Sequence, residues 1–329
     1  MATSKRGREK KLRIVVLGGG TGTFTVLSGL KKYPLDLSAV VSMADDGGST
    51  GMLRDELGVL PPGDIRQCLV ALSTSDRTMR ALMNYRFSSG RLKGHSFGNL
   101  LLSALEKITG SFDKAVEKAS EILRLRGKVI PATLDRVRLV ARLKDGRVIR
   151  GQSMIHDHNL HHLKKITLDP KGKANPKAMT ALRTAHAIVI GPGGFYSSLV
   201  PTFLISGIPQ AIRKSRAKKI YICNLMNKAG HTDGFTVKKF TEKIEEYVGG
   251  TIDYVIYNNK RPSASLITRY AREGERLVEP GPHLPRTRFV GADLISKKFP
   301  KPQKGDVLTR NLIRHNQDTL AKLILAVAQ

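Results

Sequence analysis

The chain has few cysteines, few acidic residues and few aromatic residues, and each shortage narrows what the protein can be. Its two cysteines, Cys68 and Cys223, are too few for a disulfide framework, so we expect a protein of the reducing cytoplasm. No apolar run approaches the roughly 18–20 residues of a membrane-spanning helix. The opening stretch, MATSKRGREKK, is basic and has no apolar segment, so a signal peptide is not expected.

The shortage of acidic residues leaves a large positive charge. There are 27 Asp and Glu against 56 Lys and Arg, and the net charge is +29. A surplus of this kind attracts anionic partners, nucleic acid among them. However, the basic residues are spread along the chain, and aromatic residues make up only 5% of it. Because bases are bound by basic grooves with interleaved aromatic rings, we do not expect nucleic acid to be the partner.

The apolar residues, 40% of the chain, are arranged for an α/β fold. Short apolar runs alternate with helical patterns, which predicts a Rossmann-like, doubly wound and mainly parallel sheet. We expect a mobile basic tail at 1–11 and a single domain at 12–329. An antiparallel β-hairpin is expected as an insertion at about 129–155, where RVRLVARL and VIRGQ flank an Asp145-Gly146 turn.

The stretch Ile14–Gly22, IVVLGGGTG, predicts a strand, a glycine turn and a helix that begins near Thr23. Such a turn directs backbone N–H groups and a helix N-terminus at one point, which favours a phosphate. The stretch lacks the Gly-Lys-Ser/Thr of a Walker A loop, and Thr23 occupies the third glycine position of G-x-G-x-x-G. A tight turn without a ligand is therefore the alternative. The candidate ligand residues are Gly18, Gly19, Gly20, Thr21, Gly22 and Thr23.

Two acids, Asp45 and Asp46, follow a second predicted strand at Leu37–Met43. An acid at the carboxyl end of a parallel strand can accept a hydrogen bond from a ribose hydroxyl or hold Mg²⁺. The alternative for one of them is an N-cap of the next helix. Ser49 can cap that helix and also face a ligand.

A third turn, Pro61–Arg66, opens another predicted helix, with Asp64 as its expected N-cap. Arg66 would then lie in the first helical turn, where a cation opposes the helix dipole, so we expect it to serve an anion. His95 and Asn99 lie four residues apart and should share a face near the start of the next helix.

A further strand, Ala185–Ile190, ends in glycines and leads into another predicted helix, so Gly191 and Gly193 are candidates for a second ligand wall. Asn224 lies near the end of the strand that follows. Because parallel strands end at one edge of the sheet, these turns should converge on a single cleft. A separate histidine-rich tract, HDHNLHH, leaves metal binding as a weaker hypothesis. Its histidines are His156, His158, His161 and His162.

Taken together, the ordered motifs resemble the CofD-like family, and most closely its YvcK branch, the gluconeogenesis factors. The motifs are GGGTG, ADDGGSTG, PPGDIR, GHSFGNLLL, GPGGFYSS and YICNLMNKAGHTDGF, followed by a terminal helix at about 311–328 that bears Arg314. The resemblance implies a Rossmann-like fold. CofD proteins are 2-phospho-lactate transferases that use Mg²⁺ and a deazaflavin precursor. The YvcK branch binds UDP-sugars such as UDP-N-acetylglucosamine and is linked to carbon metabolism, cell shape and cell-wall synthesis.

The resemblance further implies that the first glycine turn, Asp45, Asp46, Asp64 and Asn224 line a nucleotide cleft. It makes Arg314 a ligand of the diphosphate and Tyr270 a platform for the base. Because no nucleophile–base pair is evident beside the glycine turns, we expect a regulator that binds a nucleotide-sugar or a dinucleotide. Cell-wall synthesis proteins would be its partners, and a homo-oligomer is one assembly left open. The alternative is a transferase in which Asp45, Asp46 or Asp64 holds Mg²⁺ or orients the attacking phosphate. Two departures from the family pattern are Gly194, where Ser is usual, and Asn316, where Asp is usual.

Overall fold

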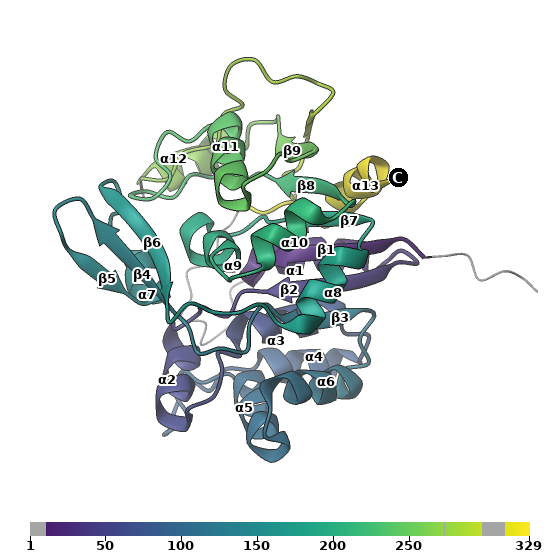
Figure 1. Ribbon diagram of the computed structural model, residues 1–329, viewed down its shortest axis with the longest axis vertical. Coiled ribbons are helices and arrows are strands. Elements are labelled where there is room, and N and C mark those ends of the chain that lie inside the picture. The colour runs from purple at the N-terminus through teal and green to yellow at the C-terminus, as the bar shows by residue number, and fades with distance from the viewer. Residues whose placement is uncertain (1–10, 273, 298–312) are drawn as a thin grey trace, which may run out of the picture.

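Seven parallel strands form the central sheet of the computed structural model, which describes residues 11–272, 274–297 and 313–329 (Figure 1). The strand order is β10-β9-β8-β7-β1-β2-β3. Every pairing in this sheet is parallel, so the predicted doubly wound α/β class is confirmed. The strands are β1 (Arg13–Gly18), β2 (Asp36–Val41), β3 (Lys128–Pro131), β7 (Ala187–Ile190), β8 (Lys218–Ile222), β9 (Tyr254–Asn258) and β10 (Phe289–Ala292).

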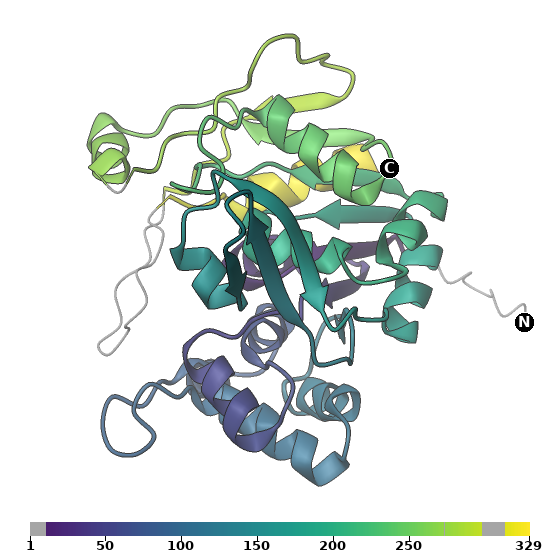
Figure 2. The ribbon, with the colours of Figure 1, turned by 60° about the vertical axis from the view of Figure 1, so that its left-hand side comes forward.

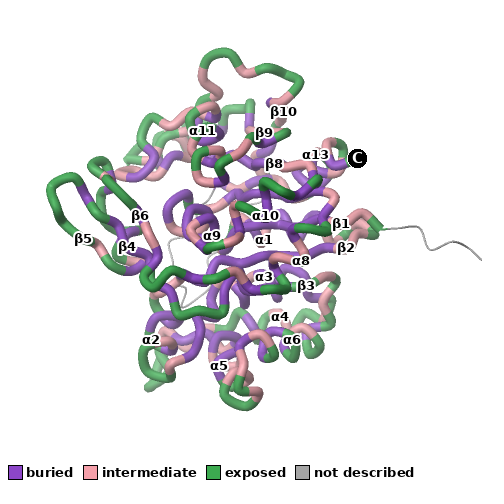
Figure 3. The backbone as a smooth tube through the Cα atoms, in the orientation of Figure 1, coloured by how far each residue is buried: buried purple, intermediate pink, exposed green. Residues whose placement is uncertain are grey.

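Helices cover both faces of this sheet, and alternate residues of β1 show it. Ile14 and Val16 join a core with α1, α3, α6 and α13, whereas Val15 and Leu17 join a core with α8 to α11. The central strands are therefore apolar throughout, and Figure 3 shows them as buried. The helices are α1 (Gly20–Leu30), α2 (Gly48–Leu57), α3 (Gly63–Leu72), α4 (Arg77–Asn84), α5 (Phe97–Thr109), α6 (Phe112–Ile122), α7 (Gln152–Asp157), α8 (Pro176–Thr184), α9 (Val200–Phe203), α10 (Ile208–Lys214), α11 (Val237–Val248), α12 (Ala264–Arg272), α13 (Gln317–Ala328) and the π-helix η1 (Phe195–Leu199).

The expected hairpin is part of a three-stranded antiparallel sheet, which stands in front of the main sheet in Figure 2. Its order is β5-β4-β6, formed by β4 (Arg138–Leu143), β5 (Val148–Arg150) and β6 (Leu163–Asp169). The predicted boundaries, 129–155, are wrong at both ends. Residues 128–131 form an edge strand of the main sheet, and the insertion continues to the third strand. The sequence predicts no third strand there.

Two further boundaries differ from the sequence prediction, and one strand was not predicted. The first helix begins at Gly20 rather than near Thr23, because the glycines themselves form its first turn. The terminal helix begins at Gln317, and the start predicted for it at Asn311 lies outside the described residues. Strand β10, at Phe289–Ala292, lies in a segment for which the sequence predicts no strand. In the described part of the chain, no helix combines the length and apolarity required to cross a bilayer.

Candidate functional site

The glycine turns meet at the carboxyl edge of β7, β1 and β2, which are neighbours in the sheet. An ideal Cβ on Gly22 would lie 2.0 Å from the backbone oxygen of Pro192, so the turns after β1 and β7 are in contact there. A Cβ on Gly63 would lie 2.5 Å from a carboxylate oxygen of Asp45, which brings the second and third turns together. These turns therefore lie together at one edge of the sheet, and the ligand cleft expected there stays a prediction.

The turn after β1 faces a carboxylate. The backbone N–H of Gly20, at the start of α1, donates a hydrogen bond to Asp64. An ideal Cβ on Gly19 would lie 2.0 Å from Oδ2 of the same side chain. The N-terminus of α1 thus holds an anionic group, as its dipole favours. Asp64 was expected to cap α3, but Pro62 occupies the N-cap position and Asp64 lies in the first turn of that helix.

Asp45 and Asp64 form a pair of carboxyl groups with perturbed pKa values. Burial raises the pKa of Asp45, although the N–H of Gly47 and the hydroxyl of Thr50 donate to it. Burial and then the negative charge of Asp45 raise the pKa of Asp64 to about 7. At neutral pH the pair therefore carries less than two negative charges, which favours the approach of an anionic ligand.

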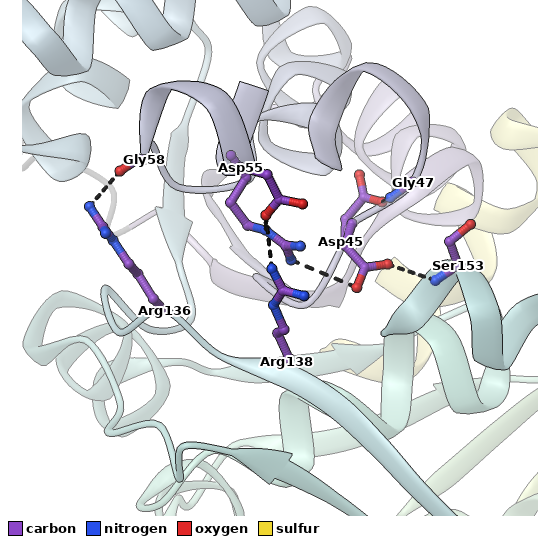
Figure 4. Close-up of polar contacts among 9 residues, drawn as sticks. Asp45, Gly47, Asp55, Gly58, Arg136, Arg138 and Ser153 are labelled. Carbon is purple, nitrogen blue, oxygen red and sulfur yellow. Dashed lines mark hydrogen bonds and ion pairs between the residues drawn. The ribbon is translucent and has the colours of Figure 1, made fainter. Parts of the chain in front are cut away.

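Asp46, the second acid of the same turn, is turned towards the insertion. Its Oδ1 accepts a hydrogen bond from the backbone N–H of Ser153 at 2.8 Å, and Arg54 lies 3.7 Å from its Oδ2. The structure thus places the carboxyl group of Asp64, and not only that of Asp46, beside Asp45, and the binding of a ligand or Mg²⁺ by Asp45 and Asp46 stays a prediction. Figure 4 shows this junction, in which Arg138 also pairs with Asp55 on α2 at 2.8 Å.

Ser49, His95 and Asn99 come together as a buried polar cluster. The hydroxyl oxygen of Ser49 lies 3.3 Å from Nδ1 of His95 and 3.3 Å from Nδ2 of Asn99. The shared helix face predicted for His95 and Asn99 is wrong, because Ser96 is the N-cap of α5 and His95 precedes it. A serine–histidine contact therefore exists beside the glycine turns, contrary to our expectation from the sequence.

Arg66 lies beneath this cluster rather than in open solvent. Its guanidinium donates to Oδ1 of Asn99 at 2.9 Å, to Oδ1 of Asn84 at 2.8 Å and to the backbone oxygen of Met83 at 3.2 Å. These three contacts tie α3 to α4 and α5. Serving an anion remains a prediction for Arg66, but the structure gives it a role in supporting the cluster.

The turn after β7 is built differently from the turn after β1. The π-helix η1 follows it and spans only five residues, so the expected ordinary helix N-terminus is absent. Asn224 joins the turn by donating from Nδ2 to the backbone oxygen of Gly193 at 2.9 Å. Gly191 and Gly193 thus border the carboxyl edge, and their contact with a ligand stays a prediction.

Among the remaining candidates, Tyr270 does not fit a stacking role. It is 4% exposed and its hydroxyl accepts a hydrogen bond from the backbone N–H of Ile313, so its ring offers no free face. Arg314 is anchored through its backbone oxygen, which accepts from the N–H of Ser296. Asn316 caps α13 by accepting from the N–H groups of residues 318 and 319, which explains why this departure from the family pattern is tolerated.

Sequence reasoning missed a set of buried polar atoms at the carboxyl edge. Oγ1 of Thr23, Oγ of Ser42 and Oδ1 of Asn224 have no hydrogen-bond partner among the described residues. Ser42 follows β2 directly and donates its backbone N–H to the oxygen of Gly18. Because buried polar atoms are normally paired, these three oxygens leave hydrogen-bonding capacity unused at this edge of the sheet. No sequence motif marks Ser42.

The histidine tract does not form a metal site. His161 pairs with Asp233 at 2.8 Å, His156 contacts Lys228 at 2.8 Å, and His158 contacts the backbone of Met154. Within the described residues no three His, Cys, Asp or Glu side chains gather closely enough to hold a metal ion. The two cysteines are buried, and burial raises the pKa of Cys223 to about 12, so this thiol stays protonated.

Comparison with known proteins identifies clear relatives. A family model described as 2-phospho-L-lactate transferase CofD matches residues 14–299. The gluconeogenesis factor of Bacillus subtilis is 38% identical over 96% of this chain and 98% of its own length. The putative gluconeogenesis factor of Clostridium acetobutylicum is 39% identical over 98% of this chain and 70% of its own length. The crystal structure of a UPF0052-family protein from Bacillus halodurans is similar with a TM-score of 0.87, at 36% identity, over 96% of this chain and 99% of that chain.

Proposed function

The chain belongs to the CofD family, and from this premise we propose that it is a cytoplasmic regulator that binds a nucleotide-sugar of the UDP-N-acetylglucosamine type. In this proposal it influences carbon metabolism, cell shape and cell-wall synthesis, with cell-wall synthesis proteins as its partners. Support comes from relatives that are named gluconeogenesis factors and that match almost the whole chain.

The observation that carries the proposal is the group of unpaired buried atoms at the carboxyl edge. Ser42 follows β2 and Asn224 follows β8, with β1 and β7 between these two strands in the sheet, and Thr23 lies in α1 just beyond the turn after β1. A sugar or ribose supplies hydroxyl groups that can both donate and accept, which is what these three oxygens lack. The N-terminus of α1 supplies the positive end of a helix dipole for a diphosphate.

The second candidate is a CofD-like 2-phospho-lactate transferase that acts on a deazaflavin precursor. The contact between Ser49 and His95 and the facing carboxyl groups of Asp45 and Asp64 favour it. These two carboxyl groups fit Mg²⁺, which proteins often hold through one or two carboxylates plus substrate phosphates. When bound, Mg²⁺ would neutralise phosphate charge. Asp46 does not fit, because Ser153 and Arg54 engage its carboxylate.

Calorimetric titration of UDP-N-acetylglucosamine, with and without Mg²⁺, tests the first candidate. We expect saturable binding to the wild-type chain. The variant Ser42→Ala removes one of the unpaired hydroxyl groups. It should weaken binding about fivefold, because one hydrogen bond to the ligand, of about 1 kcal/mol, is lost.

The matched control is Ser215→Ala, at another buried serine, whose Oγ donates to the backbone oxygen of Leu182 at 2.8 Å. This variant should bind the nucleotide-sugar as the wild type does. Absence of binding to wild-type protein would reject the first candidate. Mg²⁺-dependent transfer of 2-phospho-lactate to a deazaflavin acceptor would then establish the second.

A further inference from the structure

A pocket of about 350 Å³ is lined by β6 of the small sheet and by α11. This size suits a small metabolite. The lining comes from β6, from the loop at 231–235, from α11 and from Tyr196 in η1. It includes none of the glycine-turn residues, so the pocket is separate from the carboxyl-edge site.

Aromatic rings form the apolar part of the wall. Tyr196, Phe235 and Tyr247 line the pocket. All three rings pack edge-on against Phe195, with centroid distances of 4.9, 6.1 and 6.2 Å. The rings are therefore held in place by a common neighbour. Tyr196 is buried, whereas Phe235 and Tyr247 are half-buried and present rigid flat surfaces of the kind that a planar ring contacts well.

The acidic groups of the pocket already have partners. Asp233 pairs with His161 at 2.8 Å, and Glu246 pairs with Lys243 at 2.6 Å. By contrast, Lys164 and Lys165 are exposed and have no ion pair among the described residues. The charge that remains available to a ligand is therefore positive.

The phenol groups add hydrogen-bond donors. Burial and then the charge of Glu246 raise the pKa of Tyr196. Burial, then Tyr196 and then Glu246 raise the pKa of Tyr247, so both phenols stay protonated. Neither hydroxyl has a hydrogen-bond partner within the part of the chain that the structure describes. The pocket thus offers two cations and two neutral donors, while its acceptors are engaged.

We infer that this pocket binds a small organic anion that carries a planar ring, in addition to the ligand of the carboxyl-edge site. The ring lies against Phe235 and Tyr247, and the anionic group faces Lys164 and Lys165. The inference does not depend on the proposed nucleotide-sugar, because no lining residue belongs to that site.

Fluorescence titration of the full chain with anilinonaphthalene sulfonate, a planar aromatic anion, tests the inference. We expect saturable binding of one probe per chain. The double variant Lys164→Met/Lys165→Met removes the unpaired cations and should weaken binding about tenfold, the equivalent of roughly one charge-assisted contact. Tyr247→Phe keeps the ring, removes one donor and should weaken binding about threefold.

The matched control is Lys171→Met/Lys173→Met, which removes two exposed lysines just beyond β6 and outside the pocket. It should leave probe affinity unchanged within about twofold. Equal weakening by both double variants would mean attraction by overall charge and would overturn the inference. Displacement of the probe by UDP-N-acetylglucosamine would also overturn it, because the two ligands would then share one site. If the nucleotide-sugar does not bind at all, the lysine and tyrosine variants still decide the question.

Discussion

The turns after β1 and β7 have the same pattern in sequence, a buried strand, a run of glycines and an apolar segment, yet they differ in structure. The first opens α1, an α-helix of 11 residues whose N-terminal Gly20 N–H meets the carboxyl group of Asp64. The second opens η1, a π-helix of five residues, and is fixed from the side by Asn224. Only the first provides an aligned helix N-terminus for an anion.

This difference teaches that a glycine-rich turn predicts close approach of backbones before it predicts a phosphate. At Gly22 the close neighbour is the backbone of Pro192, and at Gly19 it is the side chain of Asp64. Both glycines are thus required by the protein itself. A ligand phosphate at the N-terminus of α1 would share the backbone N–H groups there with Asp64, or would accept a hydrogen bond from the protonated carboxyl group of Asp64.

The largest effect is expected where the two turns touch. Gly22→Ala places a Cβ 2.0 Å from the backbone oxygen of Pro192, and backbone cannot move aside as a side chain can. We expect a loss of about 2 kcal/mol in the free energy of unfolding, typical of overpacking, and loss of nucleotide-sugar binding. Chemical denaturation and calorimetry measure the two effects.

Gly193→Ala is the matched substitution in the second turn. Its Cβ would meet Leu199 at 3.4 Å, an ordinary contact, and its φ lies outside the left-handed region. The free energy of unfolding should change by less than about 0.5 kcal/mol. Equal destabilisation by the two substitutions would contradict the asymmetry that the structure shows between the turns.

Much of the fold could be predicted because strands that are buried on both faces of a parallel sheet appear in the sequence as short, continuous apolar runs. The strand predicted at Ala185–Ile190, for example, is β7, which spans Ala187–Ile190. The convergence of the turns also follows from local pattern, since every parallel strand delivers its carboxyl end to one edge. By contrast, β6 carries two adjacent lysines, Lys164 and Lys165, on a half-exposed sheet, and its alternation is too weak to predict a strand.

The roles of the two neighbouring acids could not be predicted from the sequence. Asp46 is fixed by the N–H of Ser153, which lies 107 residues away in the insertion. The sequence predicts this insertion, but no local pattern reveals that it packs against the turn after β2. Asp45 is paired with Asp64 by the packing of α3 against the first turn. The unpaired oxygen of Ser42 likewise depends on the register between β1 and β2.

The next largest effect concerns the proton of Asp64. The folded state holds this proton up to about pH 7, whereas the unfolded chain releases it near the ordinary pKa of 3.8. The carboxyl group therefore contributes stability that is complete at low pH and is lost as the pH rises through about 7. Asp64→Asn resembles the protonated group, so it should remove this loss.

Denaturation at about pH 5 and pH 8 measures the change, which is expected to be on the order of 1–2 kcal/mol after screening by water. The variant should be more stable than the wild type at both pH values, and by the larger margin at the higher pH, because the loss begins above the unfolded pKa of 3.8 and is complete above about 7. Without Mg²⁺, wild-type affinity for the nucleotide-sugar should fall over the same range. A wild-type stability that rises between these pH values would contradict the raised pKa.

A smaller effect separates stability from binding within the first turn. Thr23→Val removes a buried hydroxyl that has no partner among the described residues and preserves the shape of the side chain. Stability should stay equal or rise by up to about 1 kcal/mol, while nucleotide-sugar affinity falls. In the control, Thr241→Val, the lost hydroxyl donates to the backbone oxygen of Val237 at 2.8 Å. This control should lose about 1 kcal/mol of stability and keep its affinity. The opposite pattern would mean that the hydroxyl of Thr23 serves the fold alone.

The smallest effect is expected for an acid that does not face the first turn, because its substitution should leave the nucleotide-sugar affinity unchanged. Asp55→Asn breaks the contact of Asp55 with Arg138, in which both side chains are more than half exposed. An exposed pair of this kind contributes less than about 0.5 kcal/mol, and the nucleotide-sugar affinity should not change.

Asp46→Asn differs, because the Asp46 side chain is 8% exposed and accepts a hydrogen bond from the backbone N–H of Ser153. It should cost about 1–2 kcal/mol of stability. Since Asp46 faces the insertion, its loss should leave affinity at the wild-type level, and a strong loss of affinity would return Asp46 to the ligand site.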